Sequence, residues 1–405
     1  MIGIAILGFG VVGSGVADML FTNGDLIAQS AGEEIKLLRV VDIRDIEAPD
    51  GVIVTKSFDD VLAIPEIRIV VETIGGTRAA YDYTKRALES GRHVITSNKE
   101  LVSSMGDELL KIAREHNAMY LFEASVGGGI PVLHPIERCL SGNRITEING
   151  IVNGTANYML TRMATSGVSF PAALGEAKAL GYAEENPDND IEGWDSRRKL
   201  AILAHLCFGS KLAEEAVIPT VGISSITEGE TEAAGAFGRT IKLIAHAERE
   251  GDHWYGWVNP AAVDKGHPLS AVSQVFNGIM VHGDFVGDVM FYGRGAGSHP
   301  TASAVVGDII DVAQNINHSK PHYAPSGKPS FAVDSNRPAQ YIVRIVCNDA
   351  VLKEAEALLP GLQIRAISGA HALLTPVMPQ AELEKALHTL SAKGATMGVL
   401  LRVIG

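Results

Sequence analysis

The sequence predicts an α/β protein built from three parts. Its 405 residues are too many for one compact core, so two or three domains are expected. Residues 1–135 alternate short apolar runs with helical stretches, which indicates a parallel sheet with right-handed crossovers. Residues 339–405 show the order strand, helix, strand, strand, helix, strand, which is typical of a ferredoxin-like fold. An α+β domain at 136–320 and a linker at 321–338 lie between them.

The first domain is expected to contain at least five strands with helices between them. Runs rich in Val and Ile indicate buried parallel strands, and amphipathic stretches indicate the helices. The predicted strands are Ile2–Leu7, Ile35–Val41, Ile67–Glu72, His93–Thr96 and Met119–Glu123. The predicted helices are Gly13–Leu20, Ala79–Ser90 and Gly106–His116.

The pattern changes after residue 135. A strand near Ile145–Val152 leads into helices, and further strand-like runs follow, which predicts the α+β domain. A helix within 301–315 is expected to return and pack on the first domain. The helices are Phe170–Leu180, Ser196–Phe208 and Thr301–Gln314, and the strands are Trp254–Val258 and Val289–Phe291.

The linker and the C-terminal part are distinct in composition. Pro321–Pro338 is rich in Pro, Ser, Gly and Lys, which is typical of a linker. The predicted strands beyond it are Tyr341–Cys347, Gln363–Ser368, His371–Pro376 and Gly398–Ile404, and the predicted helices are Ala350–Leu359 and Gln380–Ala392.

Composition excludes several classes of protein. The net charge is −13, from 34 basic and 47 acidic residues, which disfavours nucleic acid and anionic membranes as partners. No apolar window approaches the ~18–20 residues that cross a bilayer. Cys139, Cys207 and Cys347 are far apart and are expected to be buried, reduced thiols. With no signal peptide, these features predict a cytoplasmic protein.

A glycine-rich turn follows the first predicted strand. Gly8-Phe9-Gly10-Val11-Val12-Gly13 matches GxGxxG and opens the first helix, the context that a dinucleotide site requires. Gly8 allows a tight turn, Gly10 allows the backbone to approach a pyrophosphate, and Gly13 allows close helix–strand packing. The motif therefore predicts a Rossmann-type domain that binds NAD or NADP.

Two charged residues leave the choice between NAD and NADP open. Asp42 ends the second predicted strand, where a carboxylate accepts ribose hydroxyls and favours NAD. Arg44 lies two residues on and is placed to receive the 2′-phosphate of NADP. Both also fit a solvated surface.

Further cofactor contacts are expected where two other strands end. Val70–Gly76 ends in a glycine turn and includes Thr73 and Gly75, while Thr96-Ser-Asn-Lys99 follows the next strand. Ligands of open α/β sheets bind at this carboxyl edge.

Three longer segments resemble the homoserine dehydrogenase family. Phe122–Pro131 is similar to its E-A-[ST]-V-G-x-G-[IL]-P segment, and Asn153–Tyr158 to its N-G-T-[ST]-N-Y segment. Gly181–Lys199 is similar to its long G-Y-x-E-x-x-P-x-x-D-x-x-G-x-D-x-x-x-K segment. The resemblance covers residues 1 to about 315. It implies an NAD(P)-dependent enzyme that interconverts L-homoserine and L-aspartate 4-semialdehyde in threonine, methionine and isoleucine biosynthesis. It also implies a homodimer or higher oligomer. The sequence shows no kinase-like segment, so a monofunctional dehydrogenase is expected.

The resemblance also implies roles for individual residues. Lys199 would be the acid/base, and Lys99 would lie beside the reacting groups. Asp195 precedes Lys199 by one helical turn, a spacing that by itself also fits a surface ion pair of little energetic value. Glu184 and Asp190 supply carboxylates for the substrate ammonium.

Two loops carry the remaining implied sites. Glu123 and the carbonyls of Val126, Gly128 and Ile130 would hold a monovalent cation such as sodium, although a metal-free glycine turn explains the segment equally well. Gly295 would approach the cofactor within Gly293–Gly297, where Arg294 replaces the family's usual proline.

The C-terminal part resembles an ACT domain, which implies an amino-acid sensor. The D-x-P-G turn of such domains is replaced by Asn348-Asp-Ala-Val-Leu352, so weak or absent threonine inhibition is expected. The alternative is that another loop, near Ser368-Gly-Ala370, forms a working pocket. Two rival functions are another NAD(P) dehydrogenase of an amino-acid pathway and a catalytically silent NAD(P)-binding sensor. The set Glu184, Asp190, Asp195 and Lys199 favours an active enzyme over the sensor.

Overall fold

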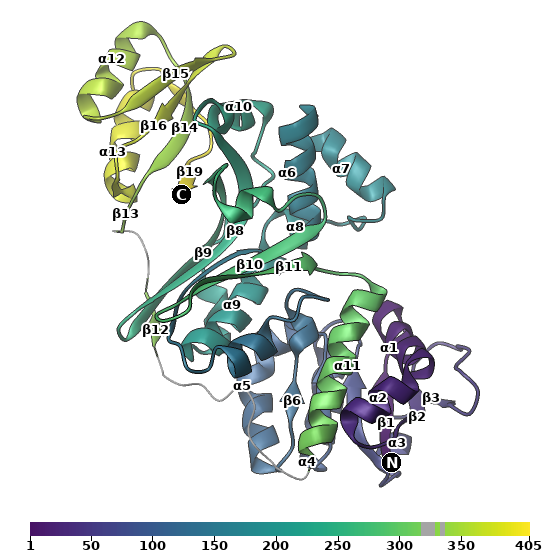
Figure 1. Cartoon of the computed structure of the whole chain (residues 1–405). Helices are drawn as coiled ribbons and strands as arrows, with labels where there is room; N and C mark the ends of the chain where they lie inside the picture. The colour runs from purple at the N-terminus through teal and green to yellow at the C-terminus, as the bar shows by residue number, and fades with distance from the viewer. Residues whose placement is uncertain (317–328, 333–336) are drawn as a thin grey trace. The chain divides into compact units, whose positions relative to one another are not determined.

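The structure is a computed structural model that describes residues 1–316, 329–332 and 337–405 (Figure 1). The chain divides into two compact units. Unit 1 contains Met1–Thr146, Arg198–Val217 and Val281–Pro329, and unit 2 contains Glu147–Arg197, Ile218–Met280 and Ser330–Gly405. The predicted linker at 321–338 falls largely outside the described residues. Within its described part, β12 (Ser330–Phe331) pairs with β9 (His253–Asp264).

Unit 1 is built on a parallel six-stranded sheet in the order β3-β2-β1-β4-β5-β6. This is the strand order of dinucleotide-binding domains, with a switch point next to β1. Every residue of β1 is buried, as expected for a strand covered on both faces. The strands are β1 (Ile2–Leu7), β2 (Ile35–Val41), β3 (Ile53–Thr55), β4 (Ile67–Glu72), β5 (His93–Thr96) and β6 (Tyr120–Leu121).

The helices that connect these strands are α1 (Val11–Thr22), α2 (Gly24–Ala31), α3 (Asp59–Leu62), α4 (Arg78–Glu89) and α5 (Lys99–Glu115). The sequence analysis missed α2, which occupies the unusually long stretch between Gly13 and Asp42. The predicted return helix is α11 (Ser298–Asn315), and it packs against α1 and α2 within unit 1 (Figure 1).

Two predicted boundaries in unit 1 are wrong. The strand expected over Met119–Glu123 shortens to β6, because a 3₁₀ turn, η1 (Glu123–Ser125), begins at Glu123. The helix expected from Gly106 begins at Lys99, where the Asn98 side chain caps it by accepting a hydrogen bond from the Leu101 N–H. Gly106 lies inside this helix and against Leu212, where a Cβ on it would lie 2.5 Å from Cδ1 of that leucine.

Unit 2 contains a long antiparallel hairpin of β8 (Arg239–Glu250) and β9, paired from Arg239↔Asp264 to Glu250↔His253. Only Trp254–Val258, in the first half of β9, was predicted from the sequence, and β8 was not predicted. The full sheet follows the order β11-β10-β7-β8-β9-β19-β14-β16-β15. The strands before the hairpin in this order are β7 (Ile145–Ile151), β10 (Phe276–Gly283) and β11 (Gly287–Arg294), and the unit boundaries fall within β7 and β10.

Of the helices that follow β7, three were not predicted from the sequence: α6 (Gly154–Ser166), α8 (Asp188–Ile191) and α10 (Glu228–Ala236). Asn153 caps α6 by accepting from the Ala156 N–H. The predicted helices are α7 (Phe170–Ala179) and α9 (Trp194–Phe208). Short turns elsewhere in the chain are η2 (Pro135–Cys139), η3 (Leu212–Val217) and η4 (Pro268–Ala271).

The C-terminal part of unit 2 confirms the predicted element order. Its strands form the antiparallel order β19-β14-β16-β15, the arrangement of a ferredoxin-like fold. Its outer strand β19 also pairs in parallel with β9, so the two sheets are continuous. The elements are β13 (Pro338–Ala339), β14 (Tyr341–Val346), α12 (Asp349–Leu358), β15 (Gln363–Ile367), β16 (Ala370–Leu374), β17 (Met378–Pro379), α13 (Gln380–Ser391), β18 (Thr396–Met397) and β19 (Leu401–Ile404).

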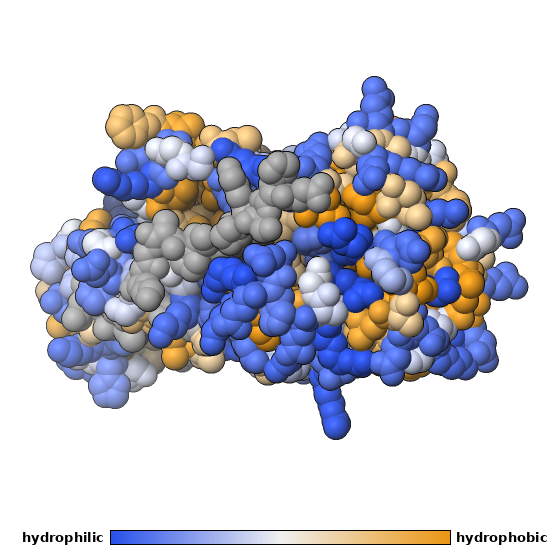
Figure 2. Space-filling view, turned by 90° about the horizontal axis from the view of Figure 1, so that it is seen from below, coloured by the Kyte–Doolittle hydropathy of each residue, from blue (hydrophilic) through white to orange (hydrophobic). Residues whose placement is uncertain are grey.

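All three cysteines are free, but Cys139 is exposed and Cys207 and Cys347 are half-buried, so the expectation that all three are buried is wrong. Cys139 lies in the short η2 turn, which leaves its side chain uncovered. On the face shown in Figure 2, hydrophilic side chains are interspersed with apolar ones. Across the described ranges, no helix is long and apolar enough to span a membrane.

Candidate active site

The glycine turn between β1 and α1 has the geometry that its motif predicts. Gly8 has a φ of +88°, a conformation that glycine adopts without strain. A Cβ on Gly13 would lie 2.1 Å from the Gly8 carbonyl oxygen, so only glycine packs there. A Cβ on Gly10 would meet no atom within 4 Å. The space beside Gly10 and the N–H groups of Val11 and Val12 in the first turn of α1 therefore fit a pyrophosphate.

Asp42 and Arg44 pair with each other at the end of β2. Two side-chain nitrogens of Arg44 donate to the Asp42 carboxylate, Nε at 2.9 Å and Nη2 at 2.8 Å. The Phe9 N–H donates to the same carboxylate at 2.8 Å. These bonds, led by the Arg44 side chain, hold the pKa of Asp42 well below its usual range. Asp42 thus positions the glycine turn, while the Arg44 side chain remains 59% exposed.

The ends of β4 and β5 meet at the carboxyl edge of the sheet. Thr73 Oγ1 donates to the carbonyl oxygens of Leu7 and Gly8 at 3.0 and 2.7 Å, which ties this edge to the glycine turn. Gly75 follows in an open loop where a Cβ would meet no atom within 4 Å. Thr73 and Gly75 therefore lie beside the expected cofactor position.

The sequence analysis missed two residues at this edge, Glu72 and Asn98. Burial raises the pKa of Glu72 to about 7, although Thr96 Oγ1 and the Ile74 N–H donate to its carboxylate. Asn98 Nδ2 donates to the carbonyls of Ile74 and Gly76 and so joins the two loops. Their only sequence signal was their position, because Glu72 is the last residue of a buried strand and Asn98 lies two residues after the end of the next one. Lys99, the first residue of α5, follows Asn98 and so starts from a fixed loop.

Two glycine loops of unit 1 pack against each other. The Gly129 N–H donates to the Arg294 carbonyl at 3.1 Å. Gly128 has a φ of +55°, and a Cβ on it would lie 2.5 Å from the Gly295 carbonyl oxygen. The loop around Gly295 is therefore held by the segment in which the cation was expected, and the close approach requires glycine at position 128.

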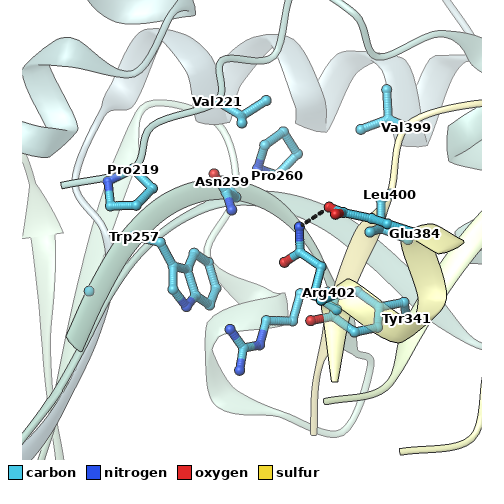
Figure 3. Close-up of a pocket in the computed structure, with 13 residues that line it drawn as sticks. Pro219, Val221, Trp257, Asn259, Pro260, Tyr341, Glu384, Val399, Leu400 and Arg402 are labelled. Carbon is cyan, nitrogen blue, oxygen red and sulfur yellow. Dashed lines mark hydrogen bonds between the residues drawn. The ribbon is translucent and has the colours of Figure 1, made fainter. Parts of the chain in front are cut away.

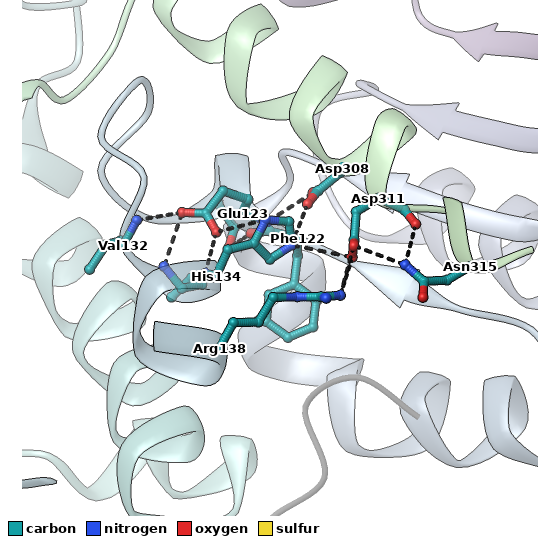
Figure 4. A network of polar contacts seen from close by, with 10 residues as sticks. Phe122, Glu123, Val132, His134, Arg138, Asp308, Asp311 and Asn315 are labelled. Carbon is teal, nitrogen blue, oxygen red and sulfur yellow. Dashed lines mark hydrogen bonds and ion pairs between the residues drawn. The ribbon is translucent and has the colours of Figure 1, made fainter. Parts of the chain in front are cut away.

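Glu123 is the centre of a buried polar network in unit 1 (Figure 4). Its Oε1 accepts from the N–H groups of Val132 and Leu133 at 2.6 and 3.0 Å, and its Oε2 accepts from the His134 N–H at 2.7 Å. The Glu123 N–H donates to Asp308 on α11 at 3.0 Å. Burial, followed by the charge of Asp308, raises the pKa of Glu123.

His134 lies between three carboxyl groups of this network. Its Nε2 is 3.1 Å from Asp308 Oδ1 and 3.8 Å from Asp311 Oδ2. Burial acts to lower the pKa of His134, but Asp308, Glu123 and Asp311 together outweigh it and raise the pKa to about 9. Arg138 also donates to both oxygens of Asp311, at 2.7 and 2.9 Å (Figure 4). The network therefore contains three carboxyl groups, those of Glu123, Asp308 and Asp311, and two basic groups, those of Arg138 and His134.

In unit 2, Asn153 brings together two of the predicted carboxylates. Its Nδ2 donates to Asp190 at 2.7 Å and to Asp195 at 2.9 Å, while its Oδ1 caps α6. Asp195 is only 3% exposed. Glu184 is exposed. The sequence analysis quoted Asn153 within a motif but gave it no role, because the bridge joins segments that are about 40 residues apart (|i−j| = 37 and 42).

The two predicted catalytic lysines lie on two helices, Lys99 on α5 and Lys199 on α9. Lys199 lies one turn after Asp195 on α9 and is 8% exposed. Its neighbour Arg198 forms an ion pair of 3.2 Å with Glu100, which follows Lys99 on α5. The ion pair therefore fixes the α9 backbone beside Lys199 to the first turn of α5.

Two family models match this chain. The model of the homoserine dehydrogenase NAD-binding domain matches residues 8–123, and that of homoserine dehydrogenase matches residues 131–310. The chain belongs to the homoserine dehydrogenase family. It is therefore an NAD(P)-dependent oxidoreductase that interconverts L-homoserine and L-aspartate 4-semialdehyde. This confirms the function that the family resemblance implied.

Individual relatives support the assignment along most of the chain. The homoserine dehydrogenase of Bacillus subtilis is 40% identical over 356 residues, 86% of this chain and 82% of that protein. The Pseudomonas aeruginosa protein is 37% identical, over 90% of this chain and 87% of its own. The crystal structure of a Thiobacillus denitrificans homoserine dehydrogenase matches with a TM-score of 0.92 at 33% identity, over 100% of this chain and 98% of that one. A hyperthermophilic archaeal homoserine dehydrogenase in complex with NADPH matches with a TM-score of 0.63 at 27% identity, over 76% of this chain and 97% of its own.

Proposed function

We propose that Lys199 exchanges the proton of the homoserine hydroxyl. The proposal is supported by its burial one turn after Asp195, whose carboxylate is itself fixed by Asn153. A buried ammonium beside a fixed carboxylate is held in one place, which general acid–base catalysis requires. Bound NAD(P) supplies the hydride acceptor. We propose that Lys99 lies beside the reacting groups, and the capped start of α5 supports this by fixing the backbone of Lys99.

The hydrogen bonds from Asn153 to Asp190 and Asp195 are the observation that best supports the proposed substrate site. Homoserine has an ammonium, and Asp190 and Asp195 offer it two carboxylates that one amide holds at hydrogen-bond distance. Without that amide, two neighbouring carboxylates would repel each other. Glu184 adds a third carboxylate from the same motif. Homoserine-dependent reduction of NAD(P), abolished in Lys199→Ala, tests this assignment.

We propose that the chain uses both NAD and NADP, through Asp42 and Arg44. Asp42→Ala should raise the kcat/KM ratio of NADP over NAD by about tenfold, because the change removes a repulsive carboxylate and releases Arg44 toward the 2′-phosphate. Arg44→Ala should move the ratio in the opposite direction. Asp45→Ala is the matched control, since Asp45 is exposed and pairs with Lys56. An unchanged ratio in Asp42→Ala would remove Asp42 from the adenosine site.

We propose that a monovalent cation binds through Glu123 and the carbonyls of Val126, Gly128 and Ile130. Three N–H groups occupy the Glu123 carboxylate, which has about four acceptor sites, so one remains. The carboxyl groups around His134 outnumber the basic groups, which also favours binding of a cation nearby. Replacing sodium by tetramethylammonium should lower Tm by ~2–4 °C, equivalent to about 1 kcal/mol. This difference should vanish in Glu123→Gln. Equal activity and equal Tm in both salts would argue against the site.

We propose that the C-terminal ACT-like part acts mainly as a packing and assembly module. Besides the pairing of β19 with β9, Arg344 Nε donates to Glu230 Oε1 at 2.9 Å and the Ser368 N–H donates to Glu232 at 3.0 Å. Only two residues separate β14 from α12, and Asn348 caps that helix, which leaves little loop for a ligand.

Sub-millimolar L-threonine should therefore leave the rate of homoserine oxidation unchanged. The physical reason is the missing Pro-Gly turn and the engagement of the Ser368 loop by Glu232. A titration of L-threonine into the assay measures this. Inhibition that disappears when the residues after Pro338 are deleted would instead establish a threonine site in this part.

We further propose a homodimer or higher oligomer, located in the cytoplasm and acting in threonine, methionine and isoleucine biosynthesis.

A further inference from the structure

A buried lysine joins three segments of unit 2. Lys242 lies on β8 and is 3% exposed. Its ammonium donates to Asn157 Oδ1 on α6 at 3.2 Å, and to the carbonyl of Val272 in the loop between η4 and β10. Within the described part of the chain, Lys242 forms no ion pair with a carboxylate. Burial lowers the pKa of Lys242 to about 8, so the group still carries a charge at neutral pH.

Two side chains of α6 hold the same loop. Asn157 Nδ2 donates to alternate carbonyls within residues 272–276, at 3.3, 3.1 and 3.0 Å. The Gln274 N–H donates to Thr161 Oγ1 at 3.1 Å. The ammonium and these two side chains therefore fix residues 272–276 to α6.

The loop also contacts the start of α6, next to the proposed substrate carboxylates. A Cβ on Gly154, the first residue of α6, would lie 2.9 Å from the Val275 carbonyl oxygen. Gly154 directly follows Asn153, whose amide donates to Asp190 and Asp195. A displacement of the loop would therefore reach Asn153 and its two carboxylate partners through a single residue of backbone.

Several features of this contact are unfavourable for stability. A buried ammonium without a carboxylate is costly. Gln274 has a φ of +58°, a conformation that residues other than glycine rarely adopt. Beside Gly154, the fully buried amide of Asn277 has no hydrogen-bond partner on either atom among the described residues. Unfavourable features of this kind persist at functional sites, which favours a role for this contact beyond packing.

The contact is closed, so it does not itself receive a ligand. Lys242 and Asn157 are both buried. A cavity of about 420 Å³ in unit 2 is lined by other residues, among them Pro219, Trp257 and Arg402 (Figure 3). An effect of Lys242 on the substrate must therefore pass through the protein backbone.

We propose that Lys242 is a positioning residue for homoserine. Its ammonium holds residues 272–276 against Gly154, and this contact keeps Asn153 where it aligns Asp190 and Asp195. The role rests on the proposed function of those two carboxylates as the receptor of the substrate ammonium.

Lys242→Met tests this role by a calorimetric titration of L-homoserine into the full chain saturated with NADPH. No hydride moves in that mixture, because substrate and cofactor are both reduced. The homoserine Kd should rise about tenfold, equivalent to about 1.4 kcal/mol. In steady-state kinetics KM should rise in parallel, with kcat unchanged within about threefold. Tm should not fall, because methionine fills the space of the lysine stem without a buried charge. Lys265→Met, at an exposed lysine directly after β9, is the matched control and should change none of these quantities.

A second variant loosens the loop without touching the ammonium. Thr161→Val removes the acceptor of the Gln274 N–H and should raise the homoserine Kd about threefold. In the double variant with Lys242→Met, the combined effect should be smaller than the product of the single effects, because both changes act through one loop.

Asp190→Asn tests the substrate carboxylates directly and should raise the homoserine Kd at least about tenfold. If Asp190→Asn weakens binding while Thr161→Val and folded Lys242→Met leave it unchanged, the role of Lys242 is overturned and the substrate site stands. Independent, fully multiplicative effects in the double variant would overturn that role as well. If Asp190→Asn itself leaves the Kd unchanged, the substrate site is wrong and the role of Lys242 fails with it.

Discussion

Lys199→Ala is expected to lower kcat for homoserine oxidation by about 10²–10⁴-fold, the range for loss of a general acid–base group. The cofactor Kd should change little, because the glycine turn and Asp42 lie on other elements. Steady-state kinetics and a direct titration of NADPH into the folded variant measure the two quantities.

Lys199→Arg separates a chemical role from a structural one. It keeps the positive charge one turn after Asp195, but a guanidinium does not release its proton near neutral pH. We expect Lys199→Arg to remain as slow as Lys199→Ala. Substantial recovery of kcat by arginine, or near-normal kcat in a folded Lys199→Ala protein, would contradict proton transfer by Lys199.

The second large effect concerns two glycines that act differently in one turn. Gly10→Ala should leave the free energy of unfolding unchanged, because its Cβ would meet no protein atom within 4 Å and its φ is −86°. The same methyl group would occupy space left for the cofactor. A steric cost of about 2–3 kcal/mol would raise the cofactor Kd by ~30- to 160-fold.

Gly13→Ala provides the comparison. Its Cβ would lie 2.1 Å from the Gly8 carbonyl oxygen, so the turn itself must shift. We expect a loss of about 1–3 kcal/mol in the free energy of unfolding together with weaker cofactor binding. Urea unfolding and NADPH titration of both variants measure the contrast. If Gly10→Ala bound NADPH like the unchanged chain, the space beside Gly10 would not be the pyrophosphate site.

Local patterns were sufficient to predict most of the nucleotide-binding sheet. Buried runs such as Ile2–Leu7 have the composition of a strand covered on both faces, and the glycine turn can be recognised without tertiary information. Helix α2 was missed because its eight residues follow α1 directly and begin at Gly24, a residue more typical of a turn. For the same reason the helix α5 was predicted to begin at Gly106, whereas this glycine lies inside the helix and close to the Leu212 side chain.

Contacts between distant segments could not be predicted from local patterns. The parallel pairing of β19 with β9 joins residues about 140 positions apart and leaves no local signature. The Asn153 bridge and the buried Glu72 likewise depend on which strand ends and loops meet in space. The family motif predicted the residue types of the site, while their hydrogen-bond partners became apparent only from the structure.

The central claim is tested most directly by the reduction of NAD and NADP by the full chain with L-homoserine as substrate. Absorbance at the reduced-nicotinamide band should rise only when homoserine is present, and the rate should fall to the background in Lys199→Ala. L-serine and L-threonine, which also carry a hydroxyl and a zwitterion, serve as comparison substrates. Folded protein that reduces neither cofactor with homoserine, or that oxidises a comparison substrate equally well, would contradict the assignment.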